Sequence, residues 1–114
     1  MPRKDPLLYV IHIRDSCERI TRYISEAADD WPSRPVIMDA VCRNLQILGE
    51  AARRLDPEFQ IAHPEVPWKS MIALRNIVTH SYDELIPEVI REIVERDIPP
   101  LLTAVRKLLE QEPR

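Results

Sequence analysis

Three side chains with distinct chemistry lie within eight residues of one another, in the segment 75–82. Arg75 supplies a permanent cation whose planar fork of donors suits phosphate. His80 titrates near neutral pH, and Tyr82 adds a phenol two residues later. Arginine stabilises charge that develops on phosphate oxygens, and histidine carries protons. These residue types at this spacing favour metal-free chemistry on a phosphodiester.

The segment before the motif predicts a helix that must position these groups. At about 100° per residue, Arg75 falls on the margin of the inward face, whereas Asn76 and His80 stack on the opposite side. Arg75 and His80 would then diverge by about 140° on a straight helix. To act on one phosphate, either the helix must turn at His80 or a second subunit must complete the site. The second alternative makes a two-fold dimer cleft attractive. The inward face is formed by Met71, Leu74 and Val78.

Apolar residues recur at three- and four-residue steps in four stretches, which predicts helices over about 5–28, 36–55, from 68 onward, and 86–109. The chain has one glycine, Gly49, and eleven prolines. Tight hairpins need more glycine than this, whereas proline suits sharp helix starts. The expected fold is all-α: a compact antiparallel bundle of four to five helices in one domain, 1–114. The region 56–67 is expected to be a proline-studded connection, and Pro99-Pro100 to interrupt the last helix, with Asp97 capping its restart.

Composition limits the functions open to this chain. The formal net charge is −3, so no general nucleic-acid-binding surface is indicated, and any RNA contact must be local. Cys17 and Cys42 lack partners at metal-ligand spacing and are expected to be reduced, buried residues of a cytoplasmic protein. His12 and His63 also lack such partners, so no metal or cofactor is expected. The sequence shows no signal peptide or membrane-spanning stretch.

Four segments resemble a known family. The motif Ala73-Leu74-Arg75-Asn76-x3-His80-x-Tyr82 matches the R-x4-H-x-Y signature of HEPN-domain proteins, particularly the HepT-like toxins. The other similar segments occur in the same order along the chain, and the resemblance covers nearly all of it. They are Asn-Leu-Gln-Ile-Leu-Gly-Glu-Ala-Ala at 44–52, His-Pro-Glu-Val-Pro-Trp at 63–68, and Asp-Ile-Pro-Pro-Leu at 97–101.

The resemblance implies a helical toxin that dimerises and cleaves RNA without metal. It maps the catalytic roles onto Arg75 and His80 and a supporting polar role onto Asn76. The family's toxins are paired with a nucleotidyltransferase antitoxin of the MNT type, which silences them by attaching AMP to the motif tyrosine. That role maps onto Tyr82. One histidine cannot readily act as base and acid in a single step, so a second copy from the other subunit would help.

Structural interpretations remain open beside the functional ones. Arg75 could form only a salt bridge, and His80 could be favoured by the negative end of the helix dipole. Tyr82 could simply cover a helix junction, and Trp68 is expected to be a packing anchor. Arg43, Arg53 and Arg54 are expected to form a solvated face, which a dimer could bring near the cleft. The alternative function is a non-catalytic helical module that binds a nucleotidyltransferase subunit.

Overall fold

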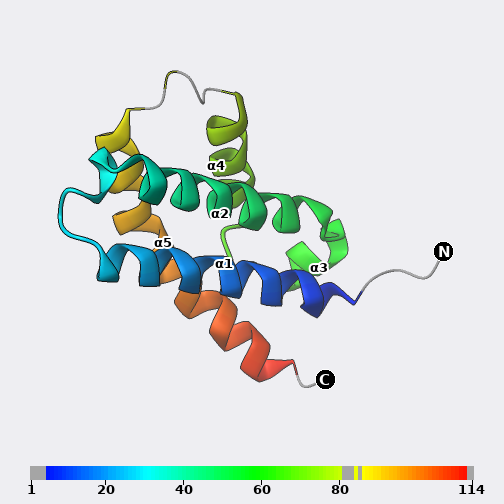
Figure 1. The fold of residues 1–114 in the computed structure, drawn as a ribbon. Helices are drawn as coiled ribbons and strands as arrows, with labels where there is room; N and C mark the ends of the chain where they lie inside the picture. The colour runs from blue at the N-terminus through cyan, green and yellow to red at the C-terminus, as the bar shows by residue number, and fades with distance from the viewer. Residues whose placement is uncertain (1–4, 81–83, 85, 113–114) are drawn as a thin grey trace.

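The computed structural model describes residues 5–80, 84 and 86–112. Within these residues the protein is built from helices alone, with no strand, which confirms the all-α prediction. Figure 1 shows the arrangement. The elements are α1 (Pro6–Glu26), the 3-10 helix η1 (Trp31–Ser33), α2 (Pro35–Arg54), α3 (Pro57–Ala62), α4 (Trp68–His80) and α5 (Pro87–Gln111).

Proline marks the helix starts, as the composition predicts. Four of the α-helices have proline at their first position: Pro6, Pro35, Pro57 and Pro87. Proline is tolerated there because the first N–H groups of a helix have no partner within the helix. Asp5 also caps α1, since its side chain accepts a hydrogen bond of 2.9 Å from the Leu7 amide.

The core lies between the predicted apolar faces. Helices α1 and α2 run antiparallel side by side, α4 packs on α2, and α5 packs against α1 (Figure 1). The predicted faces of α1, α2 and α4 are buried, including Ile13, Leu45 and Val78. Cys17 and Cys42 are free and buried, as expected. Burial raises the pKa of the Cys17 thiol to about 12, so this group stays protonated at neutral pH.

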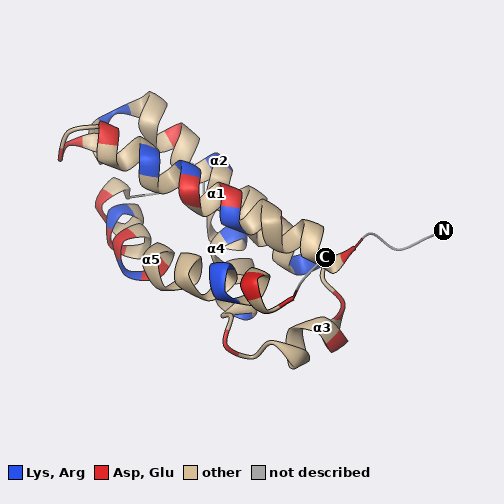
Figure 2. Ribbon diagram, turned by 90° about the horizontal axis from the view of Figure 1, so that it is seen from below, with Lys and Arg blue, Asp and Glu red and all other residues tan. Residues whose placement is uncertain are grey.

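The structure corrects two expectations. The connection between α2 and α4 contains the short helix α3, which the proline-rich sequence concealed. Pro99 and Pro100 do not interrupt α5, which continues through both and curves along its length (Figures 1 and 2). The carbonyl groups that lose an N–H partner belong to Glu95 and Arg96, and because both residues are exposed these carbonyls can be solvated. Asp97 accepts hydrogen bonds from the Arg96 side chain, at 2.9 and 3.1 Å, and does not cap a restart.

Residues of both charge signs are interspersed along the helices (Figure 2). Any basic site must therefore be assembled locally, from side chains that the packing of the helices brings together. Among the described residues, no helix combines the length and apolar character that crossing a membrane requires.

Candidate functional site

The site is organised by a close crossing of α4 over α2 at Gly49. A Cβ atom built on Gly49 would lie 2.1 Å from the Cβ of Arg75 and 2.7 Å from the carbonyl oxygen of Met71. Both distances are far shorter than van der Waals contact, so any side chain at position 49 would push the helices apart. The absence of a side chain lets α4 rest directly on α2 and fixes the origin of the Arg75 side chain there.

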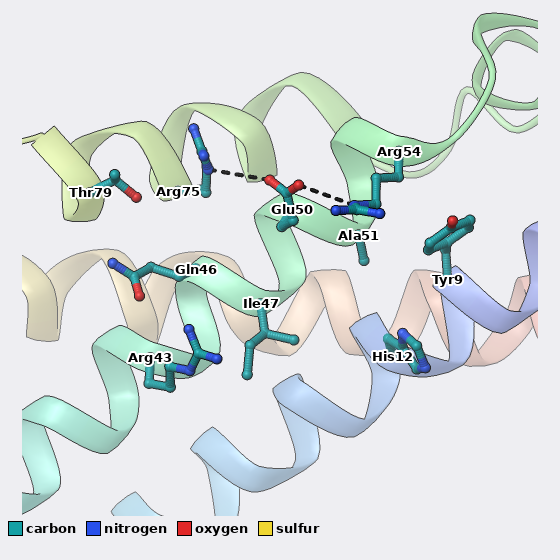
Figure 3. A pocket seen from close by; sticks show the side chains of 10 residues that line it. All are labelled: Tyr9, His12, Arg43, Gln46, Ile47, Glu50, Ala51, Arg54, Arg75 and Thr79. Atoms are coloured by element: carbon teal, nitrogen blue, oxygen red, sulfur yellow. Dashed lines mark hydrogen bonds and ion pairs between the residues drawn. The ribbon is translucent and has the colours of Figure 1, made fainter.

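The guanidinium of Arg75 has two contacts, one on each helix. Its Nε lies 3.5 Å from Oε2 of Glu50 on α2, and its Nη1 donates a 2.9 Å hydrogen bond to Oδ1 of Asn76 on α4. The side chain is 27% exposed, so it is anchored on one side and reaches solvent on the other. Figure 3 shows the contact with Glu50. This arrangement holds a guanidinium in place while leaving donors available to an anion.

Glu50 is surrounded by cations. Nη2 of Arg53 donates to it at 2.7 Å, and Nε of Arg54 donates at 3.1 Å. The hydrogen bond from Arg53, supported by that from Arg54, lowers the pKa of Glu50 to about 2, so the carboxylate is ionised at neutral pH. Three guanidinium groups therefore share one negative charge. The balance of this cluster is positive, although the whole chain carries a net negative charge.

An open hollow of about 520 Å³ lies beside this cluster. Its wall includes three arginines but only one carboxylate, so it is locally basic. Figure 3 shows the lining side chains, which come from three helices. They are Tyr9 and His12 of α1, Arg43, Gln46, Ile47, Glu50, Ala51 and Arg54 of α2, and Arg75 and Thr79 of α4.

The structure describes the other predicted site residues, Asn76, His80 and Tyr82, to different extents. Asn76 is exposed and accepts the hydrogen bond from Arg75, and its supporting role stays a prediction. The backbone of α4 stays helical up to His80, its last residue, so positions 75 and 80 lie about 140° apart around the axis. The helix thus does not turn ahead of His80, and completion by a second subunit stays a prediction. The His80 side chain and all of Tyr82 lie outside the described residues.

The structural interpretation of Trp68 is confirmed. Its side chain is buried, and its Nε1 donates a 2.9 Å hydrogen bond to the carbonyl oxygen of His63. The ring of Phe59 meets it edge-on, with centroids 6.1 Å apart. Trp68 therefore anchors the start of α4, the helix that carries Arg75. Among the described residues, no group of three or more His, Cys, Asp or Glu side chains is arranged to hold a metal ion.

Several members of the site were not singled out by sequence reasoning. Glu50 and Tyr9 belong to ordinary helical patterns, and only the packing of three helices brings them to one hollow. Gly49 did carry a signal. A glycine inside a helix costs about 1 kcal/mol relative to alanine, so one in the middle of α2 indicates a close packing contact.

Comparison with known proteins identifies the family of this chain. Residues 13–108 match the family model described as "Ribonuclease HepT-like". The protein of Caldanaerobacter subterraneus subsp. tengcongensis named "Putative RNase TTE0752" is 34% identical over 96% of this chain and 98% of its own length. The "Probable ribonuclease HepT" of Thermococcus cleftensis is 32% identical over 88% of this chain and 92% of its own length.

A longer relative contains a similar segment within a larger protein. The "Gamma-glutamylcyclotransferase and putative RNase MJ0434" of Methanocaldococcus jannaschii is 34% identical over 96% of this chain, which spans only 50% of that relative's length. No solved structure matches the chain. The family match covers α2 and α4 completely, most of α1 and α5, and the whole segment around Arg75. The chain therefore belongs to the HepT-like ribonuclease family.

Proposed function

We propose that this protein is a metal-independent endoribonuclease in which Arg75 and His80 act on RNA at a cleft between two copies of the chain. The observation that carries the proposal is the anchoring of Arg75. Its guanidinium is held between Glu50 and Asn76 at the wall of a basic hollow. Gly49 supports this anchoring, because its missing side chain lets α4 approach α2 closely enough for Arg75 to reach Glu50. Membership of the ribonuclease family supports the same reaction class.

The reaction needs three tasks from the protein. A base removes the proton from the ribose 2′-OH, the 2′-oxygen forms a bond to phosphorus, and the bond to the 5′-oxygen breaks as an acid protonates that oxygen. His80 of one protomer serves as base and His80 of the other as acid. Arg75 stabilises the charge that builds on the non-bridging oxygens. The two-fold arrangement supplies two proton carriers where one chain supplies one.

The proposal includes regulation by a partner, as a toxin held by its antitoxin. A nucleotidyltransferase antitoxin of the MNT type attaches AMP to Tyr82, two residues from His80 and close in sequence to Arg75. The added group brings bulk and negative charge to a site that must accept a phosphate. Both effects oppose RNA binding, by the same physical logic as phosphorylation.

The test is cleavage of RNA by the purified protein in EDTA, after intact mass has shown that Tyr82 is unmodified. Arg75→Ala and His80→Ala are compared with Lys69→Ala, which removes an exposed cation from the same helix. Cleavage that survives chelation, is lost in the first two variants and is kept in the third supports the proposal. Absence of cleavage across several RNAs contradicts it and favours a non-catalytic module that binds a nucleotidyltransferase.

A further inference from the structure

The basic hollow reaches beyond Arg75 to an aromatic pair on α1. Tyr9 and His12 stand at one end, with ring centroids 6.4 Å apart and ring planes at 88°. Figure 3 shows these rings on a different helix from the arginines, of which Arg54 is the one drawn nearest to Tyr9. Neither residue is needed for cleavage as proposed above. Their position nevertheless gives the hollow an aromatic end in addition to its cationic groups.

We infer that this hollow is a nucleotide subsite for single-stranded RNA, in which Tyr9 stacks on a base and Arg54 contacts a phosphate. The inference rests on the proposed function and extends it from the cleavage point to the neighbouring nucleotide. Single-stranded nucleic acids are commonly held in this way, by a cationic groove together with aromatic rings that accept any base. The hollow supplies both features within one protomer.

The aromatic end suits stacking because it is fixed. Tyr9 is half-buried and packs against the apolar core, while one side of it faces the hollow. A ring that is already held in place loses little conformational freedom when a base stacks on it. His12 is exposed beside it, and its ring plane is nearly perpendicular to that of Tyr9, so the two rings do not stack on each other.

The arginines of the hollow suit phosphate because Glu50 neutralises only part of their positive charge. Arg54 contributes one hydrogen bond to Glu50 and is 53% exposed, so other donors of its guanidinium remain at the surface. Arg43 is exposed on the same wall. Glu50 keeps the guanidinium groups close together, and a phosphate can approach them from the solvent side.

The hollow suits single-stranded RNA better than duplex RNA. A volume of about 520 Å³ falls within the roughly 300–1,000 Å³ typical of small-ligand sites, which accommodates one nucleotide unit. In a duplex the bases are stacked on one another and their faces are covered. Only an unpaired nucleotide can offer a base to Tyr9 and a phosphate to Arg54 together.

The experiment measures binding and cleavage separately on the full chain. Binding is followed by fluorescence anisotropy with a 2′-O-methyl single strand, which cannot be cut because the nucleophilic hydroxyl is blocked. Tyr9→Leu keeps an apolar side chain against the core but removes the ring. Tyr23→Leu is the matched control, since Tyr23 is a half-buried tyrosine of the same helix outside the hollow. We expect Tyr9→Leu to weaken binding about tenfold and the control to bind like the parent protein.

Two further measurements identify the contacts. On a probe whose units are abasic, the parent and Tyr9→Leu should bind equally, because no base is present to stack. Arg54→Gln should weaken binding on both probes and reduce the dependence of affinity on salt, as expected for a lost phosphate contact. A Tyr9→Leu variant that weakens abasic and normal probes alike would overturn the stacking assignment.

The outcomes separate this inference from the proposed function. If the parent cuts RNA in EDTA and Tyr9→Leu binds as tightly as the parent, the subsite is wrong and the ribonuclease assignment stands. If Tyr9-dependent binding occurs without cleavage, the subsite stands and the proposed reaction fails. If Tyr9→Leu changes the mass of the assembly in solution while RNA binding is unaltered, the hollow is a contact between subunits and the inference is overturned.

Discussion

Gly49 and Arg75 touch at the crossing of α2 and α4, where a Cβ on the glycine would lie 2.1 Å from the Cβ of the arginine. The residue after the glycine, Glu50, then lies 3.5 Å from the Nε of the same arginine. Two successive residues of α2 therefore act on one side chain of α4. The first gives Arg75 the space to approach, and the second supplies the charge that holds it.

Replacement of Gly49 by alanine is expected to destabilise the protein. In an open helical site this change would stabilise it by about 1 kcal/mol, because alanine is the better helix former. Here the new methyl group collides with Arg75 and Met71, and overpacking of this kind costs about 1–3 kcal/mol. Urea unfolding measures the difference. A gain in the free energy of unfolding would show that α4 does not rest on α2 at this point.

The ion cluster at Glu50 should leave a signature at acid pH. Its pKa is about 2 in the folded protein against an ordinary 4.5, so the folded state holds fewer protons on this group. A lowered pKa gives stability that is present above about pH 4.5 and is lost as the pH falls toward 2. Because the group is partly exposed, we expect a contribution of about 1 kcal/mol or less.

Thermal unfolding of Glu50→Gln at several pH values checks this expectation. The parent protein should lose stability more steeply than the variant between pH 4.5 and 2, and the gap between them should narrow as Glu50 becomes protonated. Glu110→Gln offers a control, since Glu110 is an exposed carboxylate near the end of α5. Equal slopes for the parent and Glu50→Gln would mean that the arginines do not hold the carboxylate in solution.

The geometry of the Arg75 side chain should matter as much as its charge. Lysine keeps the positive charge but lacks the planar fork that reaches Asn76 and the phosphate together. We expect Arg75→Lys to lower the rate of RNA cleavage by about 100-fold, the effect of removing one donor that stabilises a transition state. Folding should be nearly unchanged, as judged by circular dichroism.

Arg96→Lys is the matched control for that substitution. Arg96 is an exposed arginine of α5 that pairs with the neighbouring Asp97 and has no place in the hollow. Its replacement should leave cleavage intact. If Arg75→Lys were as active as Arg96→Lys, Arg75 would act as a diffuse positive charge, and the proposed contact with phosphate would be wrong.

Mixed dimers can test whether two histidines share one cleft. When the parent and His80→Ala are mixed in equal amounts and allowed to exchange, random pairing leaves about a quarter of the dimers with both histidines. We expect activity to fall to about a quarter of that of the same total amount of parent protein. Activity of about half would instead show that each histidine works alone. Sedimentation first establishes whether the assembly has twice the chain mass of 13.3 kDa.

Local rules explain how much of the helical fold could be predicted from the sequence. Apolar residues at three- and four-residue steps gave the inward face of α4, and Met71, Leu74 and Val78 are indeed buried. The start of α5 at Pro87 follows from the missing amide hydrogen of proline. The same rule failed at Pro99 and Pro100, because it assumes that the freed carbonyls have no other partner. The residues that carry these carbonyls, Glu95 and Arg96, are exposed in α5, so water can donate the missing hydrogen bonds.

The sequence by itself determined the four long helices and their main buried faces, and it named the candidate residues Arg75, Asn76, His80 and Tyr82, since these inferences depend on residue type and on spacing along one helix. Only the tertiary structure decided which other side chains meet Arg75. Glu50 and Tyr9 come from two other helices, and their approach depends on how closely those helices pack. That distance was set by one missing Cβ at Gly49, a contact between residues 26 positions apart that no local pattern records.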